Sequence, residues 1–93
     1  MLIKRSIEIE EFIVAYLKQH GYTDVTDSDF HDEFTAKFGG KRKNYVYGAC
    51  PNQVAMRWLK RLYDQRALSR GRISLCEHEK GFPNWVYGYS IRT

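Results

Sequence analysis

The spacing of apolar residues changes from helical to alternating along this chain, and this change constrains the fold most. Up to about residue 65, apolar residues recur at intervals of three and four in three segments, the spacing of helices with one buried face. After residue 68 they alternate with polar or small residues, most clearly in Trp85–Ile91, as in a half-buried strand. The pattern predicts an α+β domain in which three helices precede a two-stranded hairpin.

The first helix is predicted over residues 7–20. Ser6 is its expected N-cap, and Gly21 is its expected C-terminal stop. Residues 22–25 follow as a short extended segment. The predicted buried face of the helix consists of Ile9, Phe12, Ile13, Tyr16 and Leu17.

A second helix is predicted after Thr26, which is its expected N-cap. Asp29 then occupies the third helical position, as the acidic partner in a capping box. The glycine pair at residues 39–40 ends the helix. Its predicted buried face carries Phe30, Phe34 and Phe38.

A third helix is predicted to start at Pro51, a residue suited to the first helical position. This start makes Cys50 the N-cap, which is a poor one, so Asn52 is an alternative partner for the first free amides. The helix is expected to end near residues 65–67. Its predicted buried stripe is Ala55, Trp58, Leu59 and Leu62.

The remaining residues predict a hairpin with strands at 68–75 and 85–91. The connection between them, 76–84, is polar and contains Gly81 and Pro83, both typical of turns.

The charges of the chain are divided by position. Residues 1–40 hold four Lys/Arg and eight Asp/Glu, whereas residues 41–93 hold eleven and three. The formal net charge of +4 therefore hides a strongly basic second half. A surface of this kind attracts polyanions, of which nucleic acid is the most common.

The size of the chain, 93 residues, predicts a single domain over residues 1–93. No apolar run approaches the roughly 20 residues of a membrane span, and acidic residues interrupt the start where a signal peptide would be apolar. We therefore expect a cytoplasmic protein, which includes a nucleoid-associated one, or a nuclear one in a eukaryote. Cys50 and Cys76 are expected to be free thiols.

The order of elements resembles the winged helix-turn-helix superfamily over essentially the whole chain. The residues VTDSDF resemble the superfamily's strand-to-helix entry, RALSRGRISL its exit into the wing, and WVYGYSI its last strand. The link over residues 39–50 is longer than the tight turn of a simple helix-turn-helix. The resemblance implies an α+β winged-helix fold that binds duplex DNA, as a transcriptional regulator or a mobile-element accessory factor.

The resemblance also implies which residues contact DNA, with the third helix in the major groove and the hairpin on the backbone. The implied groove-facing residues are Asn52, Gln53, Met56, Arg57 and Lys60. The implied phosphate contacts are Lys41, Arg42, Lys43, Arg61, Arg70, Arg72 and Lys80.

Catalytic and metal chemistry have little support in the sequence. Cys76 and His78 are close, but no second pair has zinc-ligand spacing. His31, Asp32 and Glu33 are adjacent on a helix, where neighbours face different directions, so we expect them to be solvated. No phosphate-binding loop or nucleophile motif is present. We therefore expect a chain that is not an enzyme and has no cofactor or metal.

Two other functions remain open from the sequence. One is a protein-interaction adaptor on the same fold, with Met56, Trp85 and Tyr87 as an exposed apolar patch. The other is RNA binding, which the charge pattern does not distinguish from DNA binding. A second copy of the chain or another protein is a further expected partner.

Overall fold

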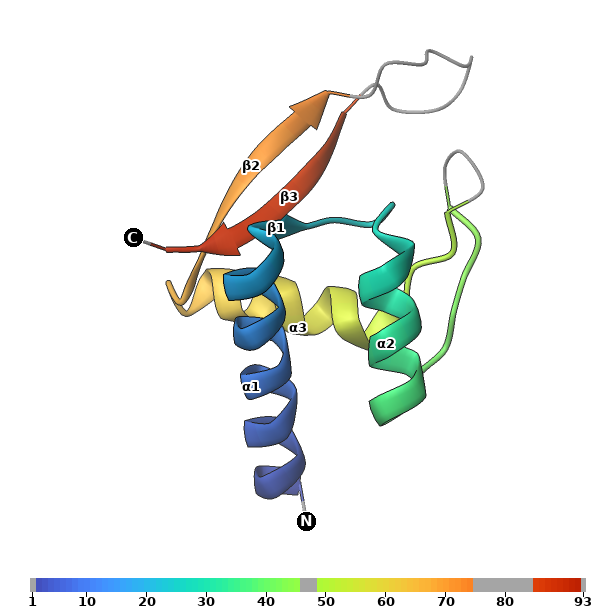
Figure 1. Cartoon of the computed structure of the whole chain (residues 1–93), viewed down its shortest axis with the longest axis vertical. Coiled ribbons are helices and arrows are strands. Elements are labelled where there is room, and N and C mark those ends of the chain that lie inside the picture. Colours follow the sequence, from blue (N-terminus) through green and yellow to red (C-terminus); the bar gives the residue numbers. More distant parts are fainter. Residues whose placement is uncertain (1, 46–48, 75–84, 93) are drawn as a thin grey trace.

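The computed structural model describes residues 2–45, 49–74 and 85–92 of the chain (Figure 1). The described residues form three helices and a three-stranded antiparallel sheet, which confirms the α+β class. The elements are α1 (Leu2–His20), β1 (Tyr22–Thr23), α2 (Ser28–Phe38), α3 (Gln53–Asp64), β2 (Leu68–Ser74) and β3 (Trp85–Ile91). None of these helices has the length and apolar character needed to cross a membrane.

The sheet has the order β1-β3-β2, with β3 in the centre. β2 pairs with β3 along its whole length, from Leu68 opposite Ile91 to Ser74 opposite Trp85. This pairing confirms the predicted hairpin, whose connection at 76–84 lies outside the described residues. β1 pairs only with Tyr89 and Ser90. It therefore leaves the first half of β3 without a strand on that side in the described structure.

The core lies where the three helices meet the base of the hairpin (Figure 1). Phe12 of α1 packs against the rings of Phe30, Phe34 and Phe38, with centroid distances of 5.7–5.9 Å. The helical spacing of these aromatic residues explains why α1 and α2 each bury one face. Phe30 and Phe34 are buried, and Phe12 and Phe38 are partly buried. The other buried apolar residues are Ile9, Ile13, Tyr16, Leu17, Ala55, Leu59, Leu62, Leu68, Val86 and Tyr89.

The starts of α1 and α2 differ from the prediction. α1 begins at Leu2, so Ser6 lies inside the helix and is not its N-cap. The N-cap of α2 is Asp27, one residue after Thr26. The Asp27 carboxylate accepts hydrogen bonds from the Phe30 backbone N–H, the Tyr16 hydroxyl and the Thr23 hydroxyl. A cap that also joins α1 and β1 accounts for the shift, because Thr26 has no carboxylate to offer them.

The start of α3 also differs from the prediction. The helix begins at Gln53, and its N-cap is Asn52, so Cys50 is not the cap and Pro51 is not the first helical residue. The Asn52 side-chain oxygen accepts hydrogen bonds from the N–H groups of Val54 and Ala55 at 2.9 and 3.1 Å. Asparagine is among the best N-cap residues, which explains why it takes this place.

The segment between α2 and α3 folds back on itself as two antiparallel arms. Arg42 forms a β-bridge with Asn52, and the Gln53 N–H donates to the Lys41 carbonyl at 2.8 Å. Gly40 has a φ of +112°, and a Cβ there would lie 2.6 Å from the Asn52 side-chain oxygen. Glycine is therefore required where the segment passes the cap of α3.

Candidate nucleic-acid interface

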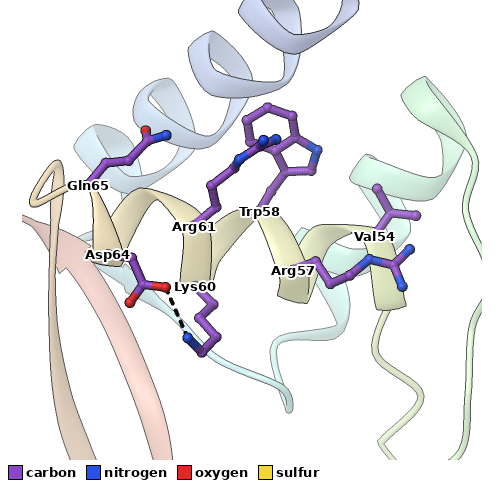
Figure 2. A pocket seen from close by; sticks show the side chains of 7 residues that line it. All are labelled: Val54, Arg57, Trp58, Lys60, Arg61, Asp64 and Gln65. Carbon is purple, nitrogen blue, oxygen red and sulfur yellow. Dashed lines mark hydrogen bonds and ion pairs between the residues drawn. The ribbon is translucent and has the colours of Figure 1, made fainter. Parts of the chain in front are cut away.

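The solvent side of α3 carries a polar stripe composed of Gln53, Arg57, Lys60 and Asp64. The buried residues Ala55, Leu59 and Leu62 occupy the opposite side of the helix, which turns this stripe outward. Lys60 forms an ion pair with Asp64 at 2.9 Å, with side chains 64% and 55% exposed. Figure 2 shows this pair on α3. A pair so exposed contributes only a few tenths of a kcal/mol, so it leaves Lys60 available to another anion.

Arg61 flanks the stripe on one side. Its guanidinium lies 5.0 Å from the centre of the Trp58 ring, and Figure 2 shows the two side chains together. An open hollow of about 710 Å³ runs along this side of α3, and its wall includes Val54, Trp58 and Arg57. The stacking holds Arg61 beside the stripe as a positively charged plane.

The hairpin flanks the stripe on its other side with two stacked arginines. The Arg70 guanidinium lies between the rings of Tyr63 and Tyr87, at 4.1 and 4.0 Å from their centres. Arg72 lies 4.5 Å from the centre of the Trp85 ring. A hydrogen bond with Tyr89 raises the pKa of Arg70 further above its ordinary value. The strand thus presents two oriented, permanently charged guanidinium groups.

Lys43 connects the stripe to the arms that precede α3. Together with Gln53 and Met56 it lines a hollow of about 260 Å³. Lys41 is exposed and lies two residues earlier on the same extended arm, where alternate side chains share a side. Lys43, Gln53 and Met56 therefore lie together at the start of α3.

Asn52, predicted to face a groove, cannot do so. Its side chain is fully buried. Besides capping α3, it donates to the Thr35 hydroxyl and the Gly39 carbonyl, both at 2.9 Å. This prediction was wrong because the side-chain oxygen accepts the hydrogen bonds that cap α3, and the amide N–H groups donate to Thr35 and Gly39 at the end of α2.

Arg42, predicted to contact phosphate, is engaged within the protein. It forms an ion pair with Asp32 at 3.0 Å and donates to the Cys50 carbonyl. Met56, also predicted to face the groove, is half-buried and packs against the core. Lys80 lies outside the described residues.

Sequence reasoning missed two residues near this surface. Tyr63 was assigned no role, yet it forms one side of the Arg70 stack. Its position seven residues after Met56 places it on the same flank of the helix, which was the available signal. His31 was expected to be solvated and is only 1% exposed. Its spacing of three and seven residues from Phe34 and Phe38 was the available signal of burial, whereas its hydrogen-bond partner Asn52 is distant in the chain.

His31 connects the link before α2 to the start of α3. Its Nδ1 accepts a hydrogen bond from the Asn52 backbone N–H at 3.1 Å. Its Nε2 therefore carries the proton and donates to the Asp24 carbonyl at 3.0 Å. Burial lowers the pKa of the imidazole, as does the nearby Arg42 guanidinium, against the opposing effect of the Asp24 hydrogen bond. His31 is therefore a neutral structural residue that fixes where α3 begins.

Among the residues that the structure describes, no group of three or more His, Cys, Asp or Glu could hold a metal ion. Cys50 is a free, half-buried thiol.

Comparisons with protein-family models, with curated proteins and with solved structures find no match to this chain.

Proposed function

We propose that this chain is a winged-helix domain that binds duplex DNA, with α3 in the major groove and the β2–β3 hairpin on the sugar–phosphate backbone. The order of its three helices and the terminal hairpin supports this proposal. A helix of the width of α3 fits the major groove of B-form DNA. A regulator of transcription or a mobile-element accessory factor is the role we propose for such a domain.

The observation that carries the proposal is the continuity of positive charge across one face. Lys43 shares a hollow with Gln53 and Met56 of α3. Met56 shares the next hollow with Trp85 and Tyr87 of the hairpin, and these two rings carry Arg72 and Arg70. Three segments far apart in the sequence therefore contribute cations to neighbouring positions.

The roles of the residues follow from their exposure and chemistry. Arg57 is exposed and Gln53 is half-buried at the start of α3. Both have side chains that can hydrogen-bond base edges, as glutamine does with adenine and arginine with guanine. The remaining cations contact phosphate, which sets affinity but not sequence preference. These are Lys41, Lys43, Lys60, Arg61, Arg70 and Arg72.

The stacked arginines favour a polyanion over an apolar protein partner. Tyr87 and Trp85, which an adaptor would expose as an apolar patch, each carry a guanidinium on the ring. Met56, the third member of that patch, is half-buried. The described strands of the hairpin therefore present cations over these two rings.

The experiment is a duplex-DNA titration of the double variant Arg57→Ala, Lys60→Ala. Both side chains are exposed, so we expect the variant to keep its stability and to lose about tenfold or more in affinity. The matched control is Lys18→Ala, Lys37→Ala, which removes two cations from α1 and α2. Equal affinity losses in both variants would contradict the assignment of α3. Stronger competition by duplex RNA would assign the surface to RNA instead, and stronger competition by single strands would assign it to single-stranded nucleic acid.

A further inference from the structure

An aromatic hollow lies between the hairpin, α3 and the arm that precedes α3. Its volume is about 340 Å³. Tyr45, Trp85, Tyr87 and Tyr89 contribute four rings to its wall, and Met56 contributes a thioether. It lies beside the first half of β3, where β1 no longer pairs. Tyr45 and Tyr87 are 52% and 37% exposed, so these two rings are accessible from solvent.

The hollow adjoins a polar one. The neighbouring hollow, of about 260 Å³, shares Tyr45 and Met56 with it and adds Lys43, Asn44 and Gln53. Asn44 and Gln53 carry amides that can donate and accept hydrogen bonds, and Lys43 carries a positive charge. The aromatic hollow is thus bordered by two amides that can hydrogen-bond the polar edge of a bound ring. The lysine beside them can bind an anion attached to that ring.

The charge around the hollow favours anionic ligands over cationic ones. Neither hollow has an Asp or Glu among its described lining residues. Arg70 and Arg72 lie over Tyr87 and Trp85. These cations repel a quaternary ammonium group, the other common guest of aromatic cages, and attract an anionic ligand. A flat ring joined to a phosphate is a nucleotide, and a volume near the lower end of the roughly 300–1,000 Å³ of ligand pockets suits one base.

We propose that this hollow receives one unpaired nucleobase of the bound DNA, with Lys43 and Arg72 on the adjoining phosphates. The inference rests on the proposed function, because the base belongs to the duplex that α3 holds. A paired base would first have to leave the stack, which costs free energy, whereas a bulged or mismatched base leaves it more readily. The domain therefore prefers duplexes that contain an unpaired base.

The test compares two short duplexes that differ only in one bulged 2-aminopurine. We expect the bulged duplex to bind about tenfold more tightly, because base–aromatic stacking contributes on that scale. The fluorescence of the 2-aminopurine should fall on binding as it stacks. Tyr45→Ala should remove the preference and leave the affinity for the paired duplex unchanged. Tyr45→Phe, which keeps the ring, should retain the preference.

Tyr22→Ala is the matched control, because Tyr22 is an equally exposed tyrosine on β1 that does not line the hollow. Equal affinities for the two duplexes, or equal losses for both duplexes in Tyr45→Ala, would overturn this inference alone. Binding of neither duplex at about 50 mM salt, where electrostatic contacts are strong, would overturn the proposed function with it.

Discussion

At the scale of single residues, Asn52 and His31 form a buried polar pair that holds the start of α3. The Asn52 backbone N–H donates to His31, and the Asn52 side chain caps the helix and bonds the end of α2. Both residues are shielded from water, so a lost partner cannot be replaced by solvent. The orientation of the exposed stripe on α3 therefore depends on two residues that never reach the surface.

Asn52→Ala tests this structural role. The substitution removes the N-cap of α3 and the hydrogen bonds that the Asn52 amide donates to Thr35 and Gly39, so the free energy of unfolding should fall by about 2–3 kcal/mol. Urea denaturation measures the change, and Gln53→Ala is the neighbouring control, expected to change stability by less than about 0.5 kcal/mol. Unchanged stability with lost DNA affinity would instead make Asn52 a base-contacting residue.

His31 makes stability depend on pH. The pKa of His31 is lowered in the folded state. Below about pH 6.5 His31 is therefore protonated to a greater extent in the unfolded chain than in the folded protein. The contribution of His31 to stability is therefore complete above about pH 6.5 and declines as the pH falls below that value. NMR titration of the folded protein should place the His31 midpoint below about 6.5, the ordinary value for histidine. A His31 midpoint at or above about 6.5 would contradict the account.

At the scale of elements, the arms between α2 and α3 give consecutive basic residues different tasks. Arg42 points toward α2, where it pairs with Asp32, and its neighbour Lys43 lines the hollow at the start of α3. Alternation along an extended arm explains this division. A run of three cations that looks uniform in the sequence therefore contains one residue that fastens the arm and two that face solvent.

The division predicts opposite outcomes for two single variants. Arg42→Ala should lower the free energy of unfolding by about 1 kcal/mol, because it loses the Cys50 hydrogen bond and a partly exposed ion pair. Lys43→Ala should leave stability unchanged and reduce the salt dependence of DNA binding by about one phosphate contact. Urea denaturation and titrations at several salt concentrations measure the two effects. The reverse pattern would refute the division.

The elements themselves could be predicted more fully than their ends. The apolar spacing predicted three helices and a hairpin, because a helix and a strand that each bury one face have apolar residues at a characteristic interval. The N-caps of α2 and α3 were expected at Thr26 and Cys50, with Asn52 as an alternative, and they lie at Asp27 and Asn52. Each observed cap also bonds residues distant in the sequence, which the local pattern does not show. The Arg70 stack was equally hidden, because Tyr63 and Tyr87 meet only after α3 packs against the hairpin.

At the scale of the whole molecule, the fold converts a charge division along the chain into a division in space. The acidic first half builds α1 and α2, while α3, the arms and the hairpin carry most of the cations. Asp64 is the one acidic residue among those assigned to the proposed DNA-binding face. We therefore expect this face to drive association with DNA, and we expect the association to weaken as salt screens it.

The most direct test is a titration of duplex DNA with the unmodified chain at about 50 and about 200 mM salt. Six cations are assigned to phosphates, and release of the counterions of even half of them should weaken binding more than tenfold between the two conditions. Binding at the lower salt with a loss of this size is the predicted result. No binding at about 50 mM salt, or an affinity that salt leaves unchanged, would contradict the central claim.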